Sequence, residues 1–452
     1  TARADTTHRG QQTPDHRQHA GHAMPGMAAD STMPHATHNG MAGMSHAYSR
    51  RLPMSRNGSG TAWQPDATPM YMWMSHHGKW MVMNHGAVFG RYTNQNIGRS
   101  GTERGGRTFD APNWLMTMAQ RNVGEKGLLN LTAMISLDPL TEGGNGYPLL
   151  FQSGEAYRGR PLVDRQHPHD LFSALSIAYT HAFSPDVDLS LYLGYPGEPA
   201  VGPTAFMHRV SAMPNPDAPL SHHWVDATHI TFGVATLGLR YRQLKVEASN
   251  FTGREPDEHR YGFDRPRADS WAGRVQWAPS RELVLEAGQA YLKSPEELHP
   301  EDNVTRTTAA VLHSRQWADY RFVASSLIWG MNKSGHGREH SALAETNLTL
   351  GRPTVYGRYE FVQKDPDELN VGHQHEGNTS FNIHALTLGT SYRLTQLGAK
   401  GPELHLGAQG SVYRPDTELR SYYGRTPVSA EVYLRLNAPL MRMGGRMNGM
   451  KM

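Results

Sequence analysis

The chain contains no cysteine, although it is 452 residues long. The absence of thiols excludes thiolate metal sites, iron–sulfur clusters and the covalent attachment of c-type haem. It also suits an oxidising compartment such as a bacterial envelope, where a stray thiol is a liability. Any metal chemistry of this chain must therefore rely on imidazole, thioether or carboxylate ligands.

Long apolar runs are missing as well. No stretch approaches the roughly 18 consecutive apolar residues that a transmembrane helix needs, so the sequence excludes a helical membrane protein. An apolar content of 38% with 46 glycines is low for an α/β enzyme of this size. The formal net charge is +3 and no basic face is visible, so we expect no nucleic-acid partner.

Sequence motifs of catalysis are also absent. There is no Gly-x-Ser-x-Gly, phosphate loop or dinucleotide fingerprint. Glu155, Asp164 and Asp170 are acidic groups, but nothing in the sequence connects them to a substrate. We therefore do not expect an enzyme, and a lipid hydrolase with Ser and His on a barrel wall is the least favoured alternative.

Beyond residue 78, apolar and polar side chains alternate in segments of about ten residues. In the segment 428–436, Val, Ala, Val, Leu and Leu alternate with Ser, Glu, Tyr and Arg. This alternation is typical of β-strands with one apolar and one polar face. We predict sixteen strands, which begin near residues 79, 113, 127, 171, 186, 228, 243, 270, 282, 305, 318, 342, 353, 380, 402 and 428.

The predicted connections alternate between long loops and tight turns such as 123–126. Long loops on one side, short turns on the other and an even strand count are typical of a transmembrane outer-membrane antiparallel β-barrel. The sequence thus predicts an all-β barrel over residues 79–437, surrounded by outer-membrane lipid, with both termini in the periplasm. The strand count suggests a homotrimer. The long loops cover 91–112, 138–170, 196–227, 253–269, 294–304, 331–341, 364–379 and 414–427.

Methionine and histidine dominate the two ends of the chain. Residues 1–78 lack periodicity and are predicted to form a disordered, low-complexity periplasmic arm, and residues 438–452 a Met-rich C-terminal tail. Sixteen of the 22 methionines lie before residue 84 or after residue 440, although cores use Met sparingly. Thioether with imidazole and without thiol favours copper, as Cu(I) or Cu(II). The candidate ligands in the arm are Met24, Met27, His35, Met41, Met44, His46, Met72, Met74, His76 and His77.

A second concentration of possible ligands lies in the two longest predicted loops and at one strand end. In porins of this strand count a long loop commonly folds into the barrel, and we predict that at least one does so here. His229, on the strand predicted near residue 228, should point into the lumen. These residues predict a copper or zinc site at a constriction, or else a hydrogen-bonded network that anchors the loops. The candidates are His167, His169, Asp170, Met207, His208, Met213, His222, His223 and His229.

A Met/His-rich arm followed by an alternating barrel resembles the copper-resistance outer-membrane protein B family. The resemblance rests on the arm pieces 22–27 (His-Ala-Met-Pro-Gly-Met), 33–35 (Met-Pro-His) and 41–46 (Met-Ala-Gly-Met-Ser-His), and this barrel is longer than that family's. It implies a barrel that binds copper and moves or sequesters it in the bacterial envelope, with a periplasmic copper protein as a candidate partner. The alternative is a general diffusion porin, or a scaffold barrel for a partner protein.

Overall fold

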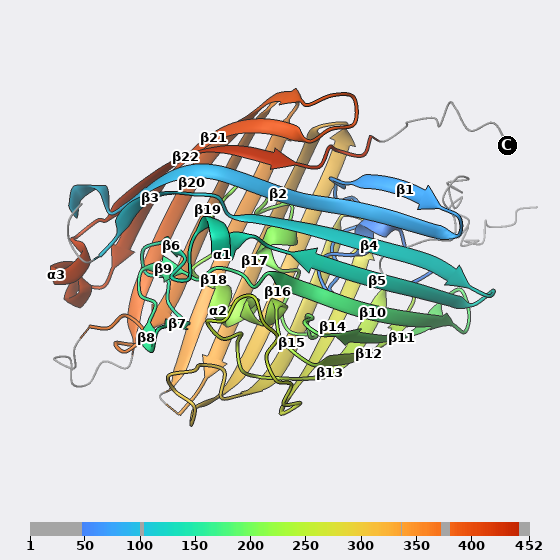
Figure 1. Cartoon of the computed structure of the whole chain (residues 1–452), viewed down its shortest axis with the longest axis horizontal. Helices are drawn as coiled ribbons and strands as arrows, with labels where there is room; N and C mark the ends of the chain where they lie inside the picture. The colour runs from blue at the N-terminus through green and yellow to red at the C-terminus, as the bar shows by residue number, and fades with distance from the viewer. Residues whose placement is uncertain (1–47, 100–103, 336, 372–379, 443–452) are drawn as a thin grey trace, which may run out of the picture. The chain divides into compact units, whose positions relative to one another are not determined.

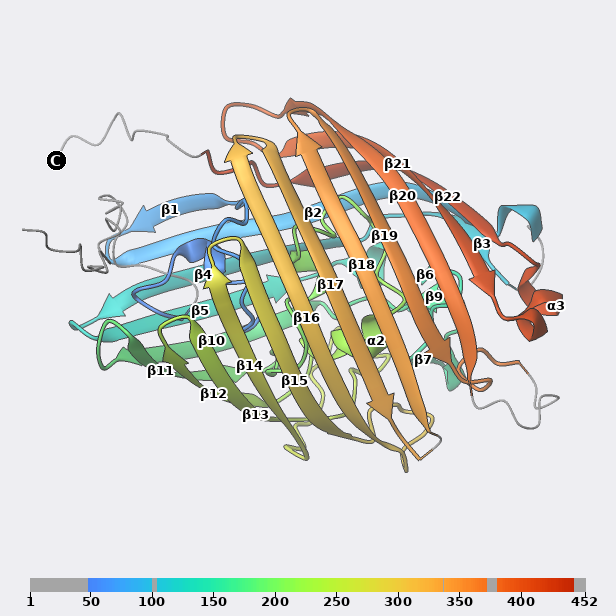
Figure 2. The same cartoon turned by 180° about the vertical axis from the view of Figure 1, so that it is seen from behind.

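A closed β-barrel forms the main body of the chain (Figures 1 and 2). The structure, a computed structural model, describes residues 48–99, 104–335, 337–371 and 380–442. Within these ranges sixteen antiparallel strands pair in chain order, and the last pairs with the first to close the barrel. They are β2 (Trp80–Gln95), β4 (Asn113–Val123), β5 (Gly127–Ile135), β10 (Phe172–Ala182), β11 (Val187–Gly194), β12 (Val234–Tyr241), β13 (Leu244–Phe251), β14 (Ser270–Ser280), β15 (Leu283–Lys293), β16 (Asn303–Ala318), β17 (Arg321–Lys333), β18 (Arg338–Leu350), β19 (Pro353–Lys364), β20 (Phe381–Gln396), β21 (Glu403–Pro415) and β22 (Val428–Asn437).

The observed strands confirm the predicted barrel. Fifteen of the sixteen predicted starts lie within four residues of the observed ones. The exception is β12, which was expected near residue 228 but begins at Val234. Residues 222–229 form helical turns instead, and Gly233 has a φ of 71° that interrupts extended backbone just before the strand. The prediction that His229 stands on a strand is therefore wrong.

Side chains alternate across the barrel wall as the sequence predicts. In β22, Glu431 and Arg435 are 3% and 1% exposed and face the interior, whereas Val432 and Leu434 are 54% and 47% exposed on the outer face. This polar-inside, apolar-outside pattern is what a barrel in lipid requires.

Helices are few and short, and none in the described residues is long and apolar enough to cross a membrane. The remaining strands are short and pair with β2 or form small hairpins in one loop. The short strands are β1 (Trp73–His77), β3 (Gly106–Asp110), β6 (Tyr147–Pro148), β7 (Ala156–Tyr157), β8 (Arg160–Pro161) and β9 (Arg165–Gln166). The helices are α1 (Asp138–Thr141), α2 (His222–Val225) and α3 (Arg420–Tyr423), with 3-10 turns η1 (Met54–Arg56), η2 (Ile97–Arg99), η3 (Phe206–His208), η4 (Ala227–His229) and η5 (Thr417–Leu419).

Part of the segment predicted as a disordered arm lies inside the barrel. Trp63 is fully buried, and Arg56 pairs with Asp66 at 2.5 Å. Nη2 of Arg274 in β14 donates a hydrogen bond of 2.9 Å to Thr61 Oγ1. The composition of this segment did not reveal its ordered structure, because a few apolar and charged residues are enough to fix it against the polar inner wall. The prediction of disorder is therefore wrong for the described residues from Tyr48 to Gly78.

The two longest loops, which connect β5 with β10 and β11 with β12, both fold into the barrel. The sequence predicts this for at least one long loop. The β5–β10 loop carries α1 and the small hairpins, and the β11–β12 loop carries η3, α2 and η4 (Figure 1). Trp224 of α2 is 1% exposed and packs with Ile328 of β17. Arg209 Nε donates a hydrogen bond of 2.8 Å to Glu345 Oε1 on β18. These contacts hold the loops against the inner wall.

Candidate metal site

Five histidines from the two inner loops lie together inside the barrel, and we call them the histidine cluster. His167 and His169 come from the β5–β10 loop, and His222, His223 and His229 from the β11–β12 loop. Ring centroids are 5.2 Å apart for His222 and His223, 5.2 Å for His222 and His229, and 5.4 Å for His169 and His229. His167 lies 5.6 Å from His223 and 6.4 Å from His169. Side chains about 50 residues apart in sequence therefore form one group.

Oxygen acceptors hold the Nδ1 atoms of three cluster members. Nδ1 of His169 lies 2.7 Å from Asp138 Oδ2, and Nδ1 of His222 lies 2.7 Å from Asp226 Oδ1. Nδ1 of His229 lies 2.8 Å from the main-chain oxygen of Asp226. An acceptor at Nδ1 places the ring proton there, so Nε2 keeps its lone pair.

The opposite ring nitrogens are buried and unpaired. Nε2 of His169, His222, His223 and His229 has no hydrogen-bond partner among the residues that the structure describes. Leaving one buried polar atom unpaired costs about 1–3 kcal/mol, so four in one place require an explanation. An imidazole whose Nδ1–H is held by an oxygen acceptor and whose Nε2 is free has the arrangement of a metal-binding histidine.

His167 and Asp170 take part in a different network. Nε2 of His167 lies 3.2 Å from Glu155 Oε1, and Arg260 pairs with both Glu155 and Asp170. Arg260 is 4% exposed, so this charged group is buried between the loops. The interpretation as a loop anchor fits Asp170 and His167, whereas it leaves the four free Nε2 atoms unexplained.

Burial favours the neutral form of two cluster members, His222 and His229. Burial lowers the pKa of His229 to about 3, and burial also lowers the pKa of His222 although its bond to Asp226 acts in the other direction. Burial by itself would raise the pKa of Asp226, but His222 and Arg209 together bring that pKa below its ordinary value. The Asp226 carboxylate thus holds the Nδ1 side of the His222 ring, and the main-chain oxygen of Asp226 holds the Nδ1 side of the His229 ring.

The donor set suits copper or zinc in kind, because neutral imidazole is a good ligand for both. Among the described residues, however, only Glu339, Asp365 and Glu368 bring three ligand atoms within 4.8 Å of one another. The imidazoles are therefore spread wider than one coordination sphere. This spacing suits binding by neighbouring pairs, or rings that move inward around an ion, better than a rigid four-ligand site.

An acidic cavity adjoins the cluster at His223. Nδ1 of His223 lies 3.3 Å from Glu255 Oε1 in the wall of this cavity. The backbone of Gly154, with a φ of 130°, comes so close to the His223 ring that a Cβ would lie 2.3 Å from it. Carboxylates that share one cavity attract cations. They are Glu155, Glu255, Glu296, Glu297, Asp302, Glu339, Asp365, Asp367 and Glu368.

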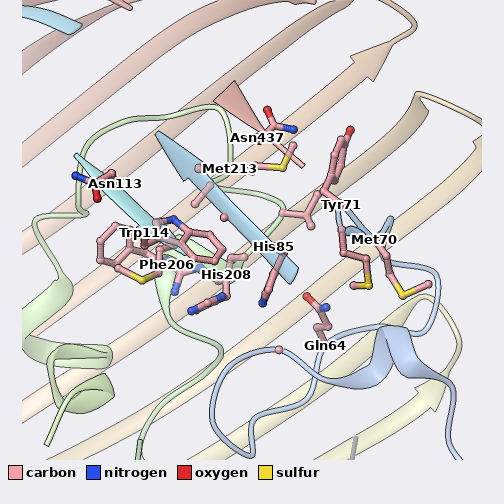
Figure 3. Close-up of a pocket in the computed structure, with 18 of the residues that line it drawn as sticks. Gln64, Met70, Tyr71, His85, Asn113, Trp114, Phe206, His208, Met213 and Asn437 are labelled. Carbon is pink, nitrogen blue, oxygen red and sulfur yellow. The ribbon is translucent and has the colours of Figure 1, made fainter. Parts of the chain in front are cut away.

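A second cavity is lined by the predicted residues Met207, His208 and Met213. Figure 3 shows His208 and Met213 in this cavity. The His208 ring lies 4.6 Å from that of Trp114 and 5.6 Å from that of His85. Next to it lie six buried methionines, which we call the methionine cluster. Its members are Met54, Met81, Met83, Met116, Met118 and Met134.

Sequence reasoning did not select His85, Trp114 or the methionine cluster as a site. The available signal was the spacing of two residues between Met81, Met83 and His85, which places all three on one face of a strand.

The predicted ligands of the arm lie in different environments. Met72 and Met74 pack against the methionine cluster. His76 and His77 stand exposed on β1, where Ser75 Oγ lies 3.0 Å from His77 Nε2. The remaining predicted ligands lie outside the described residues; they are Met24, Met27, His35, Met41, Met44 and His46.

Fold and wall chemistry together define an outer-membrane β-barrel whose interior is occupied by its own N-terminal segment and two loops. No family model and no curated protein matches the chain. Similar solved structures include Salmonella typhi OmpF in complex with daunomycin, at 9% identity and a TM-score of 0.49, covering 81% of this chain and 100% of that one.

Two further similar structures carry names of outer-membrane proteins. The outer membrane channel DcaP of Acinetobacter baumannii is 8% identical with a TM-score of 0.43, over 81% of this chain and 100% of that one. A loop-deletion mutant of Vibrio cholerae OmpT is 10% identical with a TM-score of 0.45, over 79% and 99%. At these identities the comparisons assign neither a family nor a function.

Proposed function

We propose that this outer-membrane barrel binds copper and moves or sequesters it in the bacterial envelope. One observation carries the proposal: four buried histidines keep Nε2 unpaired, and oxygen acceptors lie at their Nδ1 atoms. A loop anchor accounts for the contacts at Nδ1 but gives no role to four unpaired Nε2 atoms in one group. The ion is cargo in this proposal, taken up by neighbouring imidazoles in turn. Binding and transfer need no catalytic group, so we propose no enzymatic activity.

Copper is favoured over zinc by the surroundings of the histidines. Thioethers lie in the cavity that also contains His169 and His208. Thioether ligands favour Cu(I), and imidazole accepts both oxidation states of copper. The resemblance of the Met/His-rich arm to the copper-resistance family supports the same ion.

The proposal includes an orientation and partners. The long loops would face the outside and both termini the periplasm, as is usual for barrels of this kind. A periplasmic copper protein would deliver or receive the ion near the methionines of the two chain ends. Met70 and Met441 meet there through a hydrogen bond of 2.8 Å between their backbones. We also propose a homotrimer in outer-membrane lipid.

The competing function is a general diffusion porin or a scaffold barrel. The occupied interior favours a specific pathway: wall residues such as Gln276 and Arg274 are at most 1% exposed, beneath the N-terminal segment and the loops. A liposome swelling assay separates the two functions. Sugar permeation that does not depend on metal would favour the porin.

The test of the proposal replaces His169, His222 and His229 by Ala together in the full chain. We expect the copper content after equilibrium dialysis, measured by elemental analysis, to fall by at least one ion per chain. The control is His384→Ala, because His384 stands on the outer side of β20 beside Tyr359. An unchanged copper content in the triple variant would return these residues to a structural role.

A further inference from the structure

Methionine is gathered on one wall of the barrel interior. Of the 13 methionines in the described ranges, 11 belong to the methionine cluster or pack against it, and Met213 lines the adjoining cavity. The exception is Met331, which shares the outward phase of β17 with Leu327 and Trp329. The grouped methionines come from the N-terminal segment, three strands of the barrel, an inner loop and the C-terminal end.

Apolar packing does not explain this choice of residue. All six buried members of the cluster are methionine, with no Leu, Ile, Val or Phe among them. The five other buried clusters in the described chain contain no methionine and use Leu, Ile, Val, Phe, Tyr, Trp and Ala instead. Packing requires volume and shape, which Leu supplies as well as Met. The thioether sulfur, which Leu lacks, is therefore what distinguishes the residues of this cluster.

The strand register brings the thioethers together. Met83 of β2 stands opposite Met118 of β4, and Met116 of β4 stands opposite Met134 of β5. Directly opposed residues have Cβ atoms about 4.5–5.5 Å apart, within reach of one another's side chains. These residues face the lumen, where barrels usually carry polar groups. An apolar, sulfur-bearing patch there is an exception to the rest of this wall.

Two unpaired imidazole nitrogens border the patch. Nε2 of His85 and Nδ1 of His208 are buried and have no hydrogen-bond partner in the described residues. Figure 3 shows the two rings side by side in the cavity, with Trp114 next to His208. His85 also stands opposite Met116 across β2 and β4. This second observation, independent of the sulfur count, points to a ligand at the same place.

We propose that the methionine cluster with His85 and His208 is a second metal site, selective for a soft monovalent cation, Cu(I) or Ag(I). Uncharged thioethers favour soft ions, and they are poor ligands for Zn(II). His208 shares its cavity with His169, so this site adjoins the histidine cluster. The inference depends on the proposed function only for copper as the natural ion, since the ligands of the two sites are different residues.

The test uses Ag(I), which is redox-inert, and the full chain with Met83, Met116, Met118 and Met134 all replaced by Leu. Leucine keeps the volume and removes the sulfur. We expect at least one fewer Ag(I) ion per chain at buffered free Ag(I), measured by elemental analysis, and an unchanged Zn(II) content. Methionines elsewhere in the chain are the same in both proteins, so the difference reports the cluster. An unchanged Ag(I) content overturns the proposal.

Met331→Leu is the matched control, because it removes a sulfur outside the cluster, and it should bind Ag(I) like the unaltered protein. If it loses as much Ag(I) as the fourfold variant, the proposal is also overturned. Folding is checked by heat-modifiable migration in gels. If the fourfold variant does not fold, the pairs Met83→Leu/Met118→Leu and Met116→Leu/Met134→Leu replace it under the same criterion.

The histidine variant separates this inference from the proposed function. His169→Ala/His222→Ala/His229→Ala should keep the Ag(I) ion of the methionine cluster. If that variant retains its copper while the Leu variants lose Ag(I), the proposed role of the histidine cluster fails and the methionine site stands. If the Leu variants keep all their Ag(I) while the histidine variant loses copper, the methionine site fails and the proposed role of the histidine cluster stands.

Discussion

The histidine cluster and the methionine cluster lie next to each other but are built in opposite ways. The histidines stand on loops, and oxygen acceptors such as Asp138 and Asp226 hold their Nδ1 atoms. The methionines stand mainly on neighbouring strands, and strand register alone brings them together. One site is thus oriented by charge and hydrogen bonds, and the other by the barrel wall.

This difference predicts different sensitivities. Imidazole ligands depend on partners that fix the tautomer and the ring direction, so removing a carboxylate that never touches the ion should weaken binding. Thioether has no proton to place and needs no such partner. The methionine cluster should therefore respond to loss of sulfur and hardly at all to changes in the surrounding charges.

Asp226→Ala should have the largest effect and should damage only one of the two clusters. Asp226 is 2% exposed and accepts hydrogen bonds from His222 and, at 2.9 Å, from Arg209. Removing one partner of a buried ion pair costs about 3–5 kcal/mol of folding stability. Because Glu345 remains as the second partner of Arg209, we expect a cost near the lower bound. Denaturant unfolding of the barrel in lipid vesicles measures the loss, and the Ag(I) of the methionine cluster should remain.

The control for this change is Asp186→Ala. Asp186 pairs with Arg242 at the surface, where the two side chains are 53% and 65% exposed. An exposed pair contributes less than about 1 kcal/mol, so this variant should unfold almost like the unaltered protein. Equal destabilisation by both substitutions would show that the charge network around His222 is not what holds the loops.

Asp138→Asn should have a smaller effect on stability and a clear effect on metal binding. Asp138 accepts from His169 Nδ1 and, at 2.8 Å, from the backbone N–H of Asn113. Loss of such a supporting carboxylate typically weakens metal affinity about 10–100-fold. Competition with a copper chelator measures the change, and Asp188→Asn, a buried carboxylate paired with Arg240, should leave the affinity unchanged. Equal losses in both variants would contradict a positioning role for Asp138.

The barrel could be predicted because its signal is local. Alternation within a strand such as 428–436 is set by neighbouring residues, and loop rhythm repeats along the whole chain. The error at β12 arose because Ile230 and Phe232 continue the alternation before the strand, in a region where helical turns and Gly233 determine the backbone. Local pattern cannot show that a loop returns into the lumen and packs there.

The sites were only partly predictable. The histidines of the two loops could be proposed together, but Asp138, which orients His169, lies about 30 residues before it and gave no signal of its own. Met81 and Met83 were grouped with the arm because they follow its methionines in sequence. Their pairing with the methionines of β4 depends on strand register, which one sequence does not reveal.

Met118 offers the finest test, because two substitutions separate sulfur from volume. Met118 is 6% exposed and stands opposite Met83 across β2 and β4. Met118→Leu should cost less than about 1.5 kcal/mol while weakening Ag(I) binding. Met118→Ala should weaken Ag(I) binding too and should cost about 2 kcal/mol, the lower end for Met→Ala, because the flexible methionines around it can fill part of the cavity. Unfolding in denaturant and Ag(I) titration of both variants measure the two properties. If Leu keeps the full Ag(I) affinity, the sulfur at this position serves packing, and the contrast between the two clusters no longer holds there.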